Sequence, residues 1–142
     1  MSDSSTPPQH SPSPRELDDL ELLSHGALAP LTGFEGPDGL VTLHVPADVA
    51  ASAQRAGALE LVDPEGVPLA TVTVESVYDT GVDGQAGIVG DVAPVTHNEF
   101  GAFRRLFLSP EQVRSQYGEG AVAVPVAGPL TTKDIEHIRE AA

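Results

Sequence analysis

The sequence contains no cysteine, only seven lysines and arginines, and no long hydrophobic run. The absence of cysteine excludes disulfides, thiolate catalysis and cysteine-based zinc or iron–sulfur sites. Because 21 aspartates and glutamates oppose the seven basic residues, the net charge is −14, which repels phosphate backbones and anionic lipids. Apolar runs of a few residues are too short to span a bilayer. We therefore expect no nucleic-acid partner and no membrane association.

The length of 142 residues and the hydrophobic content of 40% favour one compact domain. The first residues lack a basic stretch followed by an apolar one, so no secretory signal is expected. A cytoplasmic location is the simplest prediction.

The N-terminal residues 1–14 are rich in serine and proline and poor in apolar side chains, which predicts a disordered tail. Leucines at helical spacing then predict a short helix over residues 16–23. Proline and glycine punctuate residues 28–39, which indicates an ordered loop. Further short helices are expected over 47–55, where a turn is the alternative, after Ser109-Pro110, and over 135–142, where Thr131 or Thr132 is the expected cap.

Alternation of apolar and polar residues predicts several short strands. The expected strands span residues 40–45, 58–62, 67–78, 88–95 and 121–126. The turn sequence Asp63-Pro64-Glu65-Gly66 joins the second to the third, so these two are predicted to form a hairpin. The last, Ala121–Val126, is predicted to be buried. The pattern is typical of a mainly β domain with short helices (α+β) or of a small β-barrel.

Titratable residues form no persuasive catalytic or metal site in the sequence. His97 has Glu99 close by, but a metal would need further ligands from elsewhere, so a solvated histidine is favoured. Asp18, Asp19 and Glu21 are expected on a solvated helix face rather than as paired acid and base.

Two further motifs have a structural explanation. Residues 81–87 are rich in glycine but lack the lysine and the strand-to-helix context of a phosphate loop. The Arg104-Arg105 pair lies among three phenylalanines at helical spacing, which is typical of core packing with the charges turned outward. We therefore assign no catalytic, cofactor-binding or metal-binding residue, and expect no cofactor.

The segment Gly26–Phe34 reads Gly-x-x-x-Pro-Leu-x-Gly-Phe and is followed by Glu35. Other informative blocks are Glu16–His25, Val41–Pro46, Leu59–Ala70, Val74–Tyr78, His97–Phe100 and Leu108–Arg114. In this order, across about residues 16 to 118, they resemble the N-terminal region of sulfate adenylyltransferase (ATP sulfurylase), which has methionine where Glu35 stands. The resemblance implies a PUA-like small β-barrel.

The catalytic groups of that family lie in the next domain, in Gln-x-Arg-Asn-Pro and His-x-x-His motifs that bind ATP and sulfate. Aligned on Pro129-Leu130, this sequence has Pro125, Ala127 and Gly128 at the Gln, Arg and Asn positions, and Thr131 and Asp134 at the two His positions. Replacing the arginine by Ala127 removes a bidentate clamp on an anion. Asp134, at the second histidine position, would repel an anion. The resemblance therefore implies a chain that does not adenylylate sulfate by itself.

The resemblance divides the chain into a disordered tail (1–14), an ATP-sulfurylase-like PUA-like domain (15–120) and a degenerate strand–helix remnant of the catalytic domain (121–142). It implies a non-catalytic interaction or regulatory module in sulfate activation, with a protein partner. One alternative is a small-ligand domain that binds an adenylyl nucleotide through residues 31–36 and 81–87. Another is a split piece of a sulfate adenylyltransferase/adenylylsulfate kinase system. RNA recognition, common among PUA-like barrels, is disfavoured by the charge of −14.

Overall fold

The computed structural model describes residues 6–95, 106 and 108–142. Backbone contacts divide the chain into two compact units, Met1–Pro110 and Glu111–Ala142. Within the described ranges, no helix has the length and apolar character needed to cross a bilayer.

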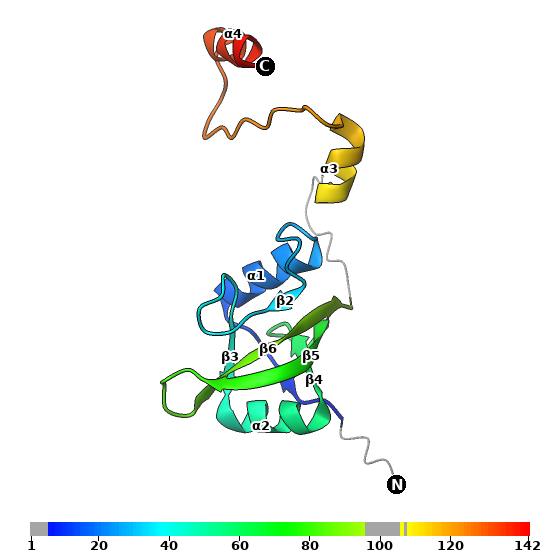
Figure 1. The fold of residues 1–142 in the computed structure, drawn as a ribbon, viewed down its shortest axis with the longest axis vertical. Helices are drawn as coiled ribbons and strands as arrows, with labels where there is room; N and C mark the ends of the chain where they lie inside the picture. The colour runs from blue at the N-terminus through cyan, green and yellow to red at the C-terminus, as the bar shows by residue number, and fades with distance from the viewer. Residues whose placement is uncertain (1–5, 96–105, 107) are drawn as a thin grey trace. The chain divides into compact units, whose positions relative to one another are not determined.

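A six-stranded sheet forms the frame of the first unit (Figure 1). Its strands are β1 (Gln9–His10), β2 (Gly33–Phe34), β3 (Leu43–Pro46), β4 (Ala58–Val62), β5 (Pro68–Asp79) and β6 (Gln85–Pro94). The order is β1-β4-β5-β6-β2, and β3 also pairs with β6. Only β1 and β4 are parallel; the other pairings are antiparallel. Among the described strands the sheet is open, with β1 at one edge and β2 and β3 sharing the other.

The predicted combination of short strands and short helices is confirmed as a mixed α and β fold, whereas closure into a barrel is not observed among these strands. The hairpin is confirmed, since β4 and β5 pair in antiparallel register from Ala58 and Thr73 to Val62 and Pro68. β6 begins at Gln85, three residues before the expected strand, because Gln85, Ala86 and Gly87 pair with β3.

Two helices pack on the sheet of the first unit, and Figure 1 shows α1 above the strands and α2 below them. α1 (Pro14–Ser24) buries Leu20 and Leu23. α2 (Ala47–Ala56) is a regular helix that buries Ala50 and Ala53, whose small side chains allow a close approach to the strands. The core joins these helices to the sheet through Phe34, Val41, Leu43, Val45, Leu59, Leu61, Ala70, Val72 and Ile88.

The structure departs from the tail expected over residues 1–14, because its described part contributes to the sheet. Gln9 and His10 form β1 beside β4, and the backbone N–H of Glu60 donates to the carbonyl of Pro8 at 3.0 Å. Pro12 is buried. Composition does not predict that this segment is ordered. The free energy that orders it comes mainly from hydrogen bonds to the backbone of a neighbouring strand, and these do not depend on apolar side chains.

The second unit holds α3 (Pro110–Tyr117) and α4 (Thr132–Ala141), which begin where the sequence predicts helices. The prediction of a buried strand over Ala121–Val126 is wrong, because the structure has no strand there and all six residues are exposed. A strand needs a neighbour to pair its backbone groups, and no described strand is hydrogen-bonded to this segment.

Two glycines allow β6 to approach its neighbours closely. A Cβ added at Gly90 would collide with the carbonyl oxygen of Thr73 on β5, and one added at Gly33 would collide with the carbonyl oxygen of Gly90. The obstacles are backbone atoms, which a rotamer change does not move aside.

We therefore expect Gly90→Ala to lower the free energy of unfolding by about 3 kcal/mol, through overpacking at a backbone contact. Gly36→Ala is the matched control, because a Cβ there meets nothing within 4 Å and its φ is not positive. Its effect should stay under about 1 kcal/mol in urea unfolding. Equal losses in the two variants would contradict the packing described for β6.

Candidate functional site

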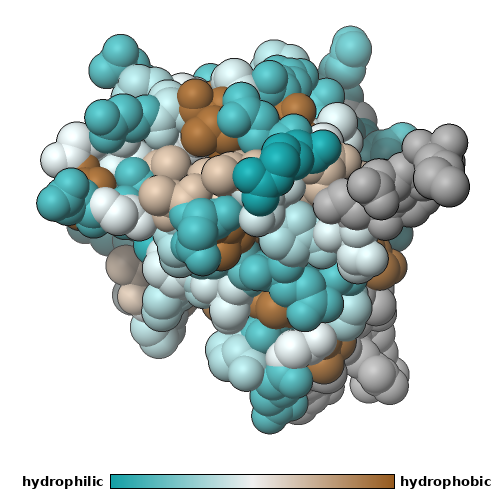
Figure 2. Space-filling model, turned by 90° about the horizontal axis from the view of Figure 1, so that it is seen from below, coloured by the Kyte–Doolittle hydropathy of each residue, from teal (hydrophilic) through white to brown (hydrophobic). Residues whose placement is uncertain are grey.

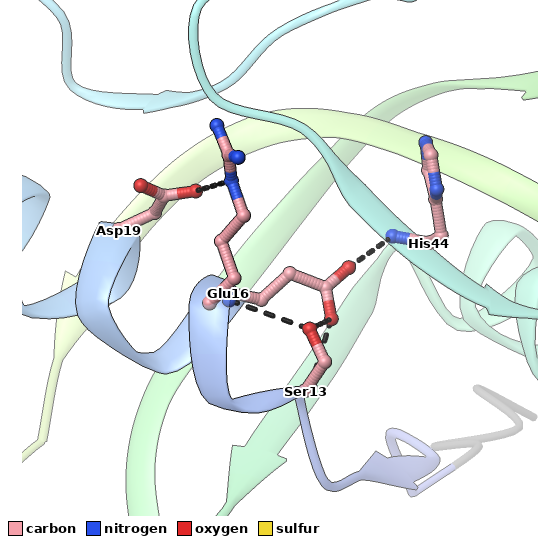
Figure 3. A network of polar contacts seen from close by, with 5 residues as sticks. Ser13, Glu16, Asp19 and His44 are labelled. Atoms are coloured by element: carbon pink, nitrogen blue, oxygen red, sulfur yellow. Dashed lines mark hydrogen bonds and ion pairs between the residues drawn. The ribbon is translucent and has the colours of Figure 1, made fainter.

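A carboxylate network joins the start of α1 to β3. Glu16 Oε2 accepts hydrogen bonds from the Ser13 backbone N–H at 2.8 Å and from Ser13 Oγ at 2.6 Å. Its other oxygen, Oε1, accepts from the His44 backbone N–H at 2.8 Å. Figure 3 shows the Glu16 side chain reaching from the helix toward Ser13 in one direction and His44 in the other. Glu16 thus caps its own helix and fixes that helix to a strand.

Beside this network lies an open pocket of about 380 Å³, which we call the N-terminal pocket. It is lined by residues 10–13, Glu16, His44 and Gln85. These residues come from the segment around β1, the start of α1, β3 and β6, so the pocket depends on docking of the N-terminal segment onto the sheet.

Burial shifts the pKa of two side chains near Glu16. It lowers the pKa of His10 below the ordinary value of 6.5, although the Glu16 carboxylate partly opposes this. Burial, and secondly the Glu16 charge, raise the pKa of Tyr78. The Tyr78 ring stands edge-on to His44, with centroids 6.3 Å apart and an interplanar angle of 79°. Its hydroxyl is buried and has no hydrogen-bond partner among the described residues.

A second open pocket of about 330 Å³ follows the loop that contains β2, and we call it the acidic pocket. It is lined by residues 30–36, Glu75 and residues 89–91. Asp91 Oδ1 accepts a hydrogen bond from Thr32 Oγ1 at 2.6 Å, and Glu35 Oε2 accepts one from the Leu40 backbone N–H at 2.7 Å. Three carboxylates, those of Glu35, Glu75 and Asp91, therefore contribute to one surface.

Neither of these two pockets offers an anion a permanently charged cation. No lysine or arginine lines either of them, whereas at least one carboxylate lines each. Phosphate and sulfate oxygens require cationic or N–H donors, and a fixed carboxylate repels them. The two segments expected to bind a nucleotide in the small-ligand alternative lie apart. Residues 31–36 line the acidic pocket. Of residues 81–87, only Gln85 lines one of the two pockets, the N-terminal pocket.

Of the glycine-rich segment 81–87, residues 81–84 lie in the turn between β5 and β6, and residues 85–87 begin β6. Gly81 and Gly84 have φ of 78° and 74°, which favours glycine over side-chain-bearing residues. The Gly81 backbone N–H donates to Asp79 Oδ1 at 2.8 Å, so this donor is already used within the turn. The segment is therefore explained by hairpin geometry.

The acidic residues predicted on the first helix interact within that helix. Asp19 lies 4.0 Å from the Arg15 Nε, and Glu21 bonds the His25 ring one turn later, while Asp18 is exposed. His97, the Arg104-Arg105 pair and its three phenylalanines lie outside the described residues. Within the described ranges, no group of three or more His, Asp and Glu side chains could hold a metal ion.

Thr131 and Asp134, aligned with the two histidines of the sulfurylase motif, form the capping box of α4. Asp134 Oδ2 accepts from the Thr131 backbone N–H at 2.8 Å and from its Oγ1 at 2.6 Å. The hydrogen bonds from Thr131 lower the pKa of Asp134 below its ordinary value. These two residues start a helix, which is a structural use of the positions.

The sequence does not predict that Ser13, Glu16, His44 and Tyr78 form one cluster. Only the first pair had a readable signal, since Ser13-Pro14-Arg15-Glu16 has the spacing of a capping box. The contact to His44 spans 28 positions along the chain and arises only from the fold.

The sequence matches no family model and no curated protein. Its fold is similar to a solved structure described as the hexameric APS kinase from Thiobacillus denitrificans, with a TM-score of 0.60 and 25% identity across 79% of this chain. The chain spans about a quarter (26%) of that protein's length. The similarity is to part of an APS kinase protein, and it does not single out the sulfurylase PUA-like domain.

Replacing Glu16 tests the network. Glu16→Ala should cost about 2 kcal/mol of unfolding free energy, because it removes the helix cap and leaves the His44 N–H without its acceptor. Asp18→Ala, on the exposed face of the same helix, is the control and should change stability by no more than about 0.5 kcal/mol. Equal effects in urea unfolding would show that Glu16 is not the tie between α1 and β3.

The lowered pKa of His10 predicts a pH dependence. The unfolded chain binds a proton at this histidine near pH 6.5, whereas the folded chain binds it only at lower pH, so stability falls as pH drops below 6.5 toward the folded pKa. In His10→Asn, the urea midpoint should fall less between pH 8 and pH 5 than it does in the parent chain. His137→Asn, on the exposed face of α4, should keep the parent's slope.

Proposed function

We propose that this chain is a non-catalytic module of the sulfate-activating machinery that acts by binding a protein partner. In this reading residues 15–120 correspond to the PUA-like N-terminal domain of the sulfurylase family, and residues 121–142 are a remnant of the next domain. A cytoplasmic location and the absence of a nucleic-acid partner belong to the same proposal.

The observation that carries the proposal is the fold similarity to part of an APS kinase protein. The two pockets add support, because carboxylates line them and no lysine or arginine does. A sulfate-activating site has to hold phosphate and sulfate oxygens, which needs the opposite electrostatics. The use of Thr131 and Asp134 as a helix cap agrees with a chain that has lost catalytic groups at these positions.

A surface role agrees with the charge of the first unit. Residues 1–110 carry 16 acidic and four basic residues, a net charge of −12. The face seen in Figure 2 is mainly hydrophilic, with hydrophobic residues in small separate groups. Charge of one sign on a partner-binding surface promotes encounter with a basic partner and disfavours acidic ones.

Two assays on the purified full chain test the proposal. We expect no sulfate-dependent release of pyrophosphate from ATP and no phosphorylation of adenylyl sulfate. In calorimetry with the adenylylsulfate kinase of the same cell, we expect saturable heat that weakens as salt screens the acidic surface. Sulfate-dependent pyrophosphate release would overturn the non-catalytic assignment, and flat calorimetry would overturn this partner.

A thermal-shift titration with ATP, adenylyl sulfate and inorganic sulfate separates the module from a small-ligand domain. A ligand at about 100 times its dissociation constant adds about 2.7 kcal/mol to stability, which raises the melting temperature by several degrees. We expect no shift with any of the three. A shift with adenylyl sulfate would favour the ligand-binding alternative.

A further inference from the structure

The second unit exposes its apolar side chains instead of burying them. None of residues 111–142 is buried. In the segment between α3 and α4, Val122, Val124 and Val126 are 61%, 43% and 55% exposed. The neighbouring helices also expose Val113 and Tyr117 on α3 and Ile135 on α4. Such a concentration of exposed apolar residues is typical of an interaction surface.

The backbone of this segment is available for pairing. Among the described residues, none of the hydrogen bonds between backbone groups involves residues 121–127. The three valines alternate with Ala121, Ala123 and Pro125, so in a strand all three valines would share one face. Their N–H and C=O groups would likewise share one edge.

Pro125 distinguishes the two edges of such a strand. It belongs to the edge of Ala121 and Ala123, where its missing N–H weakens further pairing. The valine edge has all its donors. A strand of this kind pairs on one side only, which suits a closed pair of strands and disfavours an open-ended fibre.

The valine edge is complementary to itself. In an antiparallel pair centred on Val124, that residue faces its own copy, and Val122 faces Val126 of the other copy. Six valines then form one continuous apolar face, and valine pairs across strands are stabilising. A two-fold axis through Val124 gives both strands the same hydrogen bonds and the same valine contacts.

Charge permits this self-association at the second unit. Residues 120–132 contain no ionisable side chain. Residues 111–142 carry three basic and five acidic residues, a net charge of −2, while residues 1–110 carry the remaining −12. A second copy therefore meets little repulsion at the valine segment, and a strongly basic partner would be drawn to the first unit instead.

We propose that two copies of this chain associate through Ala121–Val126, which pair as antiparallel strands about a two-fold axis at Val124. α3 and α4 flank the segment along the chain. Tyr117 of α3, Ile135 of α4 and Leu130, which precedes α4, cover the valine face. An isolated two-stranded ribbon is only marginally stable, so this cover is part of the association.

Cross-linking tests the register, and the absence of cysteine makes the test specific. In the proposed pair the two Cα atoms at position 124 lie about 5.5 Å apart, within the range of a disulfide. The two Cα atoms at position 122 lie four residues out of register, about 14 Å apart. Val124→Cys should give a covalent dimer on mild oxidation, at least about tenfold faster than Val122→Cys.

Sedimentation of the full chain gives the second readout. We expect a concentration-dependent dimer that Val124→Pro weakens at least about tenfold, because the variant loses a paired N–H at the axis. Ala123→Pro is the matched control and should leave the dimer unchanged, since its N–H points to the unpaired edge. A parent chain that stays monomeric at all concentrations, equal cross-linking at positions 122 and 124, or equal effects of the two prolines would each overturn the proposal.

Discussion

The first unit depends on how closely β6 approaches its neighbours. β6 pairs with β5, β3 and β2, so most of the sheet is joined through this one strand. Gly90 leaves room for the Thr73 carbonyl, and Gly87 leaves room for the ring of Tyr78, into which an added Cβ would project. Because positions 87 and 90 carry no side chain, the Tyr78 ring and the Thr73 carbonyl occupy the space that a side chain would fill. The position of Tyr78 beside His44 therefore follows from a glycine on the adjacent strand.

The Glu16 network uses this frame to position the N-terminus. Once β3 is fixed on β6, the His44 N–H offers a donor that only a carboxylate from α1 satisfies. The same carboxylate holds Ser13, so α1 and the segment before it are positioned by one side chain. A carboxylate that accepts three hydrogen bonds holds the helix, the segment before it and the strand in one arrangement.

The two units differ in what they present to other molecules. The first unit buries a core of apolar residues and carries a net charge of −12. The second carries a net charge of only −2 and leaves its valines exposed. An acidic surface favours long-range encounter with a partner, whereas an uncharged apolar segment favours close, self-complementary contact. The proposed role in sulfate activation and the proposed dimer therefore rest on separate parts of the chain.

The sequence by itself determined the local elements. Alternation and turn residues predicted the hairpin of β4 and β5, and Thr131 was readable as the cap of α4, because these signals lie within a few neighbouring residues. Only the tertiary structure decided that Gln9 and His10 join the sheet and that Glu16 meets His44. It also decided that none of the described strands pairs with Ala121–Val126. Each of these depends on which groups from distant positions in the sequence come into contact, and local composition does not encode such contacts.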